Sequence, residues 1–110
     1  MHLARTWIVA VSLGLVAAVA RAEPPAPTIG QPGKDVIWIP TPEPVLERML
    51  ATAQVTAADH VYDLGAGDGR LVLLAARRFG ARATGIEYDA GLVAVGRREA
   101  AKQGLSAERF

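Results

Sequence analysis

The sequence VYDLGAGDGR at residues 61–70 decides how the rest of the chain is interpreted. Its apolar start ends in Asp63, three glycines follow at alternate positions, and a helical pattern opens at Leu71. Glycine adopts backbone conformations that are closed to other residues, and it lets a ligand approach the main chain. The free N–H groups of a helix N-terminus would face that ligand. The stretch therefore predicts a strand, a tight turn and a helix, with a nucleotide-type ligand at the carboxyl end of the strand.

The spacing of the glycines and the acids beside them indicate which ligand this turn would bind. The dinucleotide fingerprint is G-x-G-x-x-G, but here the third glycine comes one residue early, at Gly69, and Arg70 takes its place. Asp63 and Asp68 add two carboxylates, which would repel a pyrophosphate and suit a ligand that carries positive charge. An NAD-binding oxidoreductase fragment is therefore the weaker alternative, and a purely structural turn is another.

The pattern Asp-x-Gly-x-Gly-x-Gly, from Asp63 to Gly69, resembles the first motif of class I S-adenosylmethionine (SAM)-dependent methyltransferases. The resemblance implies a Rossmann-like, doubly wound parallel α/β sheet, with SAM as the cofactor. It also implies that Asp63 and loop carbonyls hold the methionine ammonium group, while the glycines let the methionine part approach. The cofactor-binding residues that it assigns in this loop are Asp63, Gly65, Ala66, Gly67 and Gly69.

A second short strand is predicted at residues 83–89, and it carries an acid near its end. Glu87 lies 22 positions after Gly65. An acid about 20 residues after the glycine turn is placed to accept hydrogen bonds from both ribose hydroxyls. The SAM-dependent family has the same device, so Glu87 is the predicted ribose ligand. By the same resemblance, Tyr88 lines the adenine.

Three helices are predicted, at residues 42–53, 69–79 and 90–103, each with a candidate cap. Thr41 is the predicted N-cap of the first helix, with Pro42 at its first position, where a missing N–H costs nothing. Asp68 is the predicted cap of the second helix and Asp89 that of the third.

The segment before the first helix has two parts. Residues 23–34 are rich in Pro and Gly and predict an extended or disordered linker, whereas residues 35–39 form an apolar run that should pack on the domain. The run, the Pro-Thr-Pro sequence and the glycine motif together resemble small bacterial class I methyltransferases and the protein-lysine methyltransferases related to them. In those proteins the Pro-Thr segment lies over the cofactor, which would bring Thr41 to SAM. A helix cap and nothing else is an equal alternative for Thr41.

Residues 1–22 have the pattern of a secretory signal peptide. Arg5 gives a basic start, residues 7–20 are apolar, and Ala-Arg-Ala ends at Ala22 as a cleavage site. The apolar core is shorter than the ~20 residues of a membrane-spanning helix. We expect export, to the periplasm or outside the cell, with cleavage after Ala22. Because SAM is made and kept in the cytosol, membrane anchoring through uncleaved residues 7–20 and a cytoplasmic protein are the alternatives.

The composition narrows the choice of partners. The 110 residues carry a formal net charge of +1, without the basic surplus of a dedicated nucleic-acid binder. The chain has no Cys and two distant His, which excludes disulfides and thiolate metal sites and disfavours any metal cluster. We expect no metal, and an unidentified methyl acceptor that is a protein or a small molecule.

The predicted elements amount to half of a doubly wound fold. A parallel sheet is normally buried on both faces. The predicted chain has three helices, two strands and the start of a third strand at residues 106–110, which is too little to bury such a sheet. We therefore expect a fold truncated after its second βα unit, with residues 35–110 forming part of a methyltransferase domain. In the family, the acceptor loops and any base follow later strands, so the catalytic residues are unknown. A truncated, non-catalytic protein is the alternative.

Overall fold

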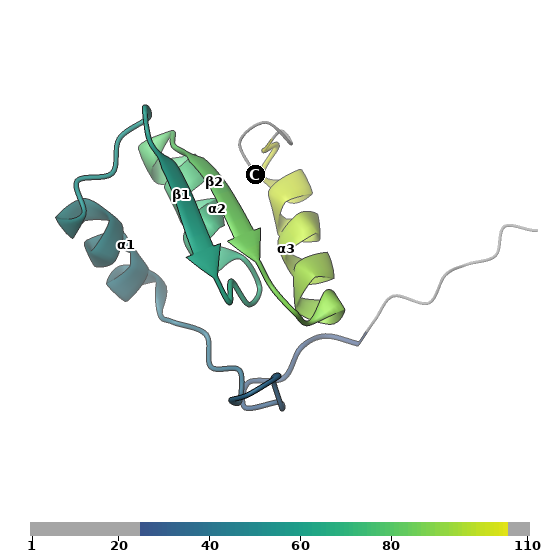
Figure 1. The fold of residues 1–110 in the computed structure, drawn as a ribbon. Helices are drawn as coiled ribbons and strands as arrows, with labels where there is room; N and C mark the ends of the chain where they lie inside the picture. Colours follow the sequence, from purple (N-terminus) through teal and green to yellow (C-terminus); the bar gives the residue numbers. More distant parts are fainter. Residues whose placement is uncertain (1–24, 106–110) are drawn as a thin grey trace, which may run out of the picture.

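A computed structural model describes residues 25–105. The predicted signal peptide and the start of a third strand lie outside the described residues. The elements, in chain order, are α1 (Glu43–Thr52), β1 (His60–Leu64), α2 (Arg70–Phe79), β2 (Arg82–Ile86) and α3 (Ala90–Lys102) (Figure 1). Across the described part of the chain, no helix is both long and apolar enough to cross a membrane.

The two strands form a parallel pair joined by α2. The register runs from His60 opposite Arg82 to Leu64 opposite Ile86. α2 lies behind the sheet in Figure 1, and both α1 and α3 contact α2. The strands end toward the segment that precedes α1, so this segment faces the carboxyl edge of the sheet. The predicted strand–helix–strand unit of an α/β fold is confirmed.

The core lies between α2 and its neighbours. Residues 72–76 of α2 are all buried, and Val72 and Leu74 are its largest fully buried side chains. Leu46 and Leu50 of α1 complete the apolar cluster together with Ala83 of β2. These apolar positions hold α2 on the sheet and α1 on α2.

The opposite face of the sheet carries exposed apolar side chains. Tyr62, Leu64 and Ile86 are 62%, 78% and 55% exposed. Among residues 25–105, no helix packs on this face, because α1 and α3 make their helix contacts with α2. The helices of the described chain therefore cover one face of the sheet.

The start of α1 differs from the prediction. Pro42 occupies the N-cap position with extended backbone, φ −59° and ψ 140°, and makes no side-chain cap bond. The helix begins at Glu43, one residue later than expected. Thr41 is therefore not the cap, because the chain is still extended at the following residue.

The other two caps have different outcomes. Asp89 caps α3 as predicted, since its Oδ1 accepts hydrogen bonds from the N–H groups of Gly91 and Leu92 at 2.7 and 3.1 Å. Gly69, not Asp68, holds the N-cap position of α2, because its left-handed backbone (φ 79°) makes the turn into the helix. β2 ends at Ile86, three residues before the predicted end of that strand.

Part of the predicted linker forms a short hairpin. Gly30 N–H donates to the carbonyl of Trp38 at 2.8 Å, and Trp38 N–H donates to Gln31 at 2.9 Å. Gly33 N–H donates to Val36 at 2.9 Å and closes the tip. We call residues 30–38 the N-terminal hairpin. The expectation of an extended chain throughout residues 23–34 is thus wrong for residues 30–34, because the backbone there is paired with residues 36–38.

Candidate functional site

The glycine loop at residues 65–69 joins β1 to α2 and folds back onto the end of β2. The N–H groups of Gly65 and Ala66 both donate to the carbonyl of Ile86, at 2.8 and 3.0 Å. Gly65, Gly67 and Gly69 have φ values of 87°, 57° and 79°. Three left-handed residues in five explain the alternate glycines, because other residues rarely adopt this conformation. A Cβ atom on Gly65 would meet nothing within 4 Å, so the main chain is open there.

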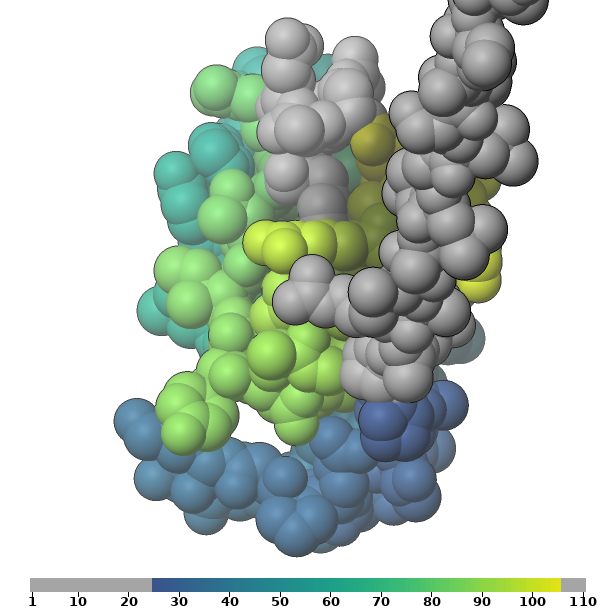
Figure 2. All heavy atoms as spheres, turned by 90° about the vertical axis from the view of Figure 1, so that its right-hand side faces the viewer, coloured from purple at the N-terminus to yellow at the C-terminus, as the bar shows by residue number. Residues whose placement is uncertain are grey.

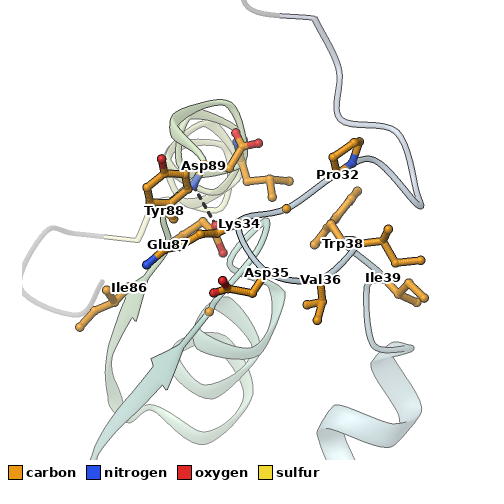
Figure 3. Close-up of a pocket in the computed structure, with 14 residues that line it drawn as sticks. Pro32, Lys34, Asp35, Val36, Trp38, Ile39, Ile86, Glu87, Tyr88 and Asp89 are labelled. Carbon is orange, nitrogen blue, oxygen red and sulfur yellow. Dashed lines mark hydrogen bonds between the residues drawn. The ribbon is translucent and has the colours of Figure 1, made fainter.

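Glu87 lies just beyond β2 and holds the loop in place. One of its carboxylate oxygens accepts from Gly67 N–H at 2.8 Å, and the other accepts from Asp89 N–H at 2.8 Å. Figure 3 shows the second of these bonds. Sequence reasoning missed the contact with Gly67, which joins residues 20 positions apart. A carboxylate offers about four acceptor positions, so Glu87 keeps two for hydroxyl donors.

Asp63, at the carboxyl end of β1, is half-buried and faces a second acid. Burial raises the pKa of Asp63, and the negative charge of Glu87 raises that pKa further. Both causes disfavour the ionised carboxylate, and a cation placed between the two groups would offset them by attracting the ionised form. The pair therefore suits a positively charged ligand.

Asp68 does not contribute free negative charge to this site. Its carboxylate forms a two-pronged ion pair with Arg70, with Nε–Oδ1 at 2.9 Å and Nη2–Oδ2 at 2.7 Å. This pairing also raises the pKa of Arg70. The expectation that Asp63 and Asp68 together attract a cation is therefore wrong for Asp68. Glu87 is the second acid beside Asp63 instead.

The N-terminal hairpin covers the carboxyl edge of the sheet. In Figure 2 the blue N-terminal part of the described chain lies beneath the green and yellow part that includes α3. Gln31 donates from Nε2 to the Oδ2 of Asp89 at 3.2 Å, and Lys34 Nζ lies 5.8 Å from the ring centre of Tyr88. A Cβ atom on Gly67 would lie 2.5 Å from the indole nitrogen of Trp38. Sequence reasoning did not assign a site role to Trp38.

Trp38 lines two cavities. The larger, of about 460 Å³, lies between the hairpin and the start of α3 (Figure 3), and Gly65, Glu87 and Tyr88 are among its lining residues. The smaller, of about 150 Å³, lies between the glycine loop and the segment that leads into α1. The residues that line both cavities are Trp38, Ile39 and Gly65. The two cavities therefore meet along a shared wall.

The cavities bring together most of the predicted site residues. The smaller one is lined by the predicted residues Thr41, Asp63, Gly65, Ala66 and Gly67. Gly69 lines neither cavity and shapes the turn into α2 instead. Within residues 25–105, no three acidic, His or Cys side chains are grouped as a metal site would require.

Part of the chain is similar to known methyltransferases. Residues 61–110 match the profile of a family described as a methyltransferase domain. A protein-lysine N-methyltransferase from Saccharolobus islandicus (strain REY15A) is 49% identical over 55 residues, which are 49% of this chain and 34% of that protein.

Two solved structures have the same fold. An RNA methyltransferase from Salinibacter ruber, crystallised with S-adenosyl-L-homocysteine, matches with a TM-score of 0.62 and 50% identity, over 64% of this chain and 46% of that chain. The YjhP protein from E. coli matches with a TM-score of 0.57 and 25% identity, over 62% and 28% of the two chains.

The parallel α/β unit and its glycine loop define a Rossmann-like methyltransferase fold. Residues 61–110 are similar to a methyltransferase domain, and the fold resembles that of a methyltransferase crystallised with S-adenosyl-L-homocysteine, as the glycine motif predicted. It spans about a third of the length of the curated relative and less than half of the Salinibacter enzyme.

Proposed function

We propose that this chain forms the cofactor-binding half of a SAM-dependent methyltransferase. The observation that carries the proposal is the pair of neighbouring acids, Asp63 and Glu87, beside a glycine loop whose main chain is open at Gly65. When bound, SAM supplies an electrophilic methyl group on a positively charged sulfonium. The donor set fits this group, because the two acids favour a cation and the loop admits a ligand to the backbone.

Each end of the site has a distinct task. In the smaller cavity Asp63 would hold the methionine ammonium group, with Thr41 in the facing wall. In the larger cavity Glu87 would accept the ribose hydroxyls with its two remaining acceptor positions, and Tyr88 would line the adenine. The hairpin above the carboxyl edge would keep water from the bound ligand, which strengthens the electrostatic contacts inside.

Calorimetric titration of SAM into the full chain tests this proposal. We expect saturable binding, and we expect Glu87→Ala to weaken it at least tenfold, because hydrogen bonds to charged groups contribute about 1.5–3 kcal/mol each. Glu47→Ala is the matched control, since Glu47 is an acid on α1 that pairs with Arg78 outside both cavities. Equal affinity of wild type and Glu87→Ala would refute the ribose assignment. A wild-type chain that binds NAD but no SAM would refute the proposed function.

For the methyl acceptor we propose a protein or a small molecule. The relatives act on different acceptors by their names, a protein lysine in one case and RNA in another. The net charge of +1 lacks the basic surplus that extended nucleic acid requires, and this supports the proposal. The test is transfer of label from methyl-labelled SAM to protein, small-molecule and RNA fractions. Label that enters RNA alone would overturn it.

For the location we propose export, with cleavage after Ala22. The support is the basic start, the apolar core and the small-residue cleavage site in residues 1–22. Intact mass and cell fractionation of the native protein test it. We expect a mass reduced by residues 1–22 in the exported fraction. An uncleaved chain in the membrane fraction would instead support anchoring, and one in the cytosol would support the cytoplasmic alternative.

A further inference from the structure

We propose that Arg70 is a positioning residue, which clamps the Pro40–Pro42 segment onto the glycine loop and thereby sets the affinity of the cofactor site. The proposal rests on the proposed function. Arg70 is the first residue of α2, and its guanidinium reaches in two directions. Nε and Nη2 bind the Asp68 carboxylate, and Nη1 donates to the carbonyl of Thr41 at 3.1 Å. One side chain thus joins segments that are 29 positions apart.

The demands of the helix do not explain an arginine at this position. A cation in the first turn of a helix is disfavoured by the helix dipole, by about 0.3–1 kcal/mol. The ion pair with Asp68 compensates for this unfavourable interaction with the dipole, but a neutral residue at position 70 would not need such compensation. The planar guanidinium has five donors in a fixed fork, so it can bind a carboxylate and a carbonyl at the same time, whereas the ammonium of lysine cannot reproduce that geometry.

The segment that Arg70 holds has few other means of attachment. Pro40 and Pro42 have no backbone N–H to donate. Among the hydrogen bonds of residues 25–105, the one from Arg70 to Thr41 is the only one that joins residues 38–42 to residues 65–70. Residues of both segments line the smaller cavity. The width of the cavity around Asp63 therefore depends on Arg70.

The first test compares two arginines of the same helix in the full chain. Arg77 pairs with Glu43 of α1 at 2.9 Å, but it lines neither cavity. We expect Arg70→Gln to weaken S-adenosylhomocysteine binding about tenfold, the scale of coupling between neighbouring contacts. Arg77→Gln should change the affinity by less than about twofold, although it should lower the melting temperature about as much as Arg70→Gln does. Equal losses of affinity in the two variants would show that Arg70 contributes only to stability.

Arg70→Lys separates charge from geometry. It keeps the positive charge beside Asp68 but cannot bind Asp68 and Thr41 together, so its affinity should resemble that of Arg70→Gln. Wild-type affinity in Arg70→Lys would overturn the clamp and leave only a role for charge. This variant also carries the test if Arg70→Gln does not fold.

A second measurement needs no ligand. In a Trp7→Phe background, Trp38 is the remaining tryptophan of the chain. Release of the Pro40–Pro42 segment should increase acrylamide quenching of Trp38 in Arg70→Gln and leave it unchanged in Arg77→Gln. Unchanged quenching in Arg70→Gln would overturn the clamp. A wild-type chain that binds no S-adenosylhomocysteine would instead contradict the proposed function, and the quenching result would still decide the role of Arg70.

Discussion

The contact between Gly67 and Trp38 predicts that a single methyl group at residue 67 damages the site more than the fold. Gly67 has φ +57°, and an added Cβ would lie 2.5 Å from the indole nitrogen and 3.2 Å from a ring carbon of Trp38. The left-handed conformation costs alanine about 1–2 kcal/mol. Alanine also restricts the unfolded chain more than glycine does, which stabilises the folded state by about 0.4–1 kcal/mol. The midpoints of these two ranges predict a net loss of about 0.8 kcal/mol in Gly67→Ala from backbone strain alone.

Gly80→Ala is the matched control. Gly80 ends α2 with φ +68°, and its added Cβ would lie at an ordinary 3.4 Å from that of Ala57. It therefore carries the same backbone cost without displacing an indole. A loss of 1 kcal/mol lowers the melting temperature of a domain this size by about 4–8 °C. We expect both variants to melt about 2–8 °C below the wild type.

The two variants should differ in ligand binding. Relief of the 2.5 Å approach requires the indole to move, and Trp38 lines both cavities. We expect Gly67→Ala to bind S-adenosylhomocysteine at least tenfold more weakly in calorimetry, with a shifted Trp38 emission in the Trp7→Phe background. Gly80→Ala should bind like the wild type. If Gly67→Ala binds equally well, the indole does not limit the site and the reasoning is refuted.

Three further predictions concern stability. Asp63→Asn should raise the melting temperature near neutral pH, because the folded pKa of Asp63 is raised and the ionised carboxylate therefore destabilises the fold. The gain in melting temperature should shrink as the pH falls and disappear below the ordinary pKa of 3.8. Melting curves without this trend would contradict the prediction. Leu74→Ala, at 2% exposure, should lose about 2–5 kcal/mol in urea unfolding, whereas Leu64→Ala, at 78% exposure, should lose less than about 0.5 kcal/mol; similar losses would disprove the one-sided core. Asp89→Ala should lose about 0.5–2 kcal/mol through the cap of α3, and an unchanged urea midpoint would exclude the cap.

Features with a local cause could be predicted from the sequence. The alternation of Gly65, Gly67 and Gly69 specifies left-handed turns, and these three residues adopt them. Asp89 caps α3 because its carboxylate reaches N–H groups only two and three residues away. The βαβ unit follows from apolar runs on either side of an amphipathic helix.

Features that depend on distant residues could not be predicted. Arg70 neutralises Asp68, so the count of acids in the glycine motif overstated the negative charge of the site. The contact of Trp38 with Gly67 spans 29 positions and has no periodic signature. The cap assigned to Thr41 failed because Pro42 extends the backbone for one more residue.

The repulsion between Asp63 and Glu87 ties ligand binding to proton exchange. Burial and the charge of Glu87 raise the pKa of Asp63, and a bound cation would offset both by favouring the ionised carboxylate, so binding near that pKa should release part of a proton into the solvent. The heat of binding would then vary with the ionisation enthalpy of the buffer, and the number of protons released would fall toward zero at pH values well above the pKa of Asp63. Ligand binding to this site should therefore be coupled to the release of a proton from Asp63.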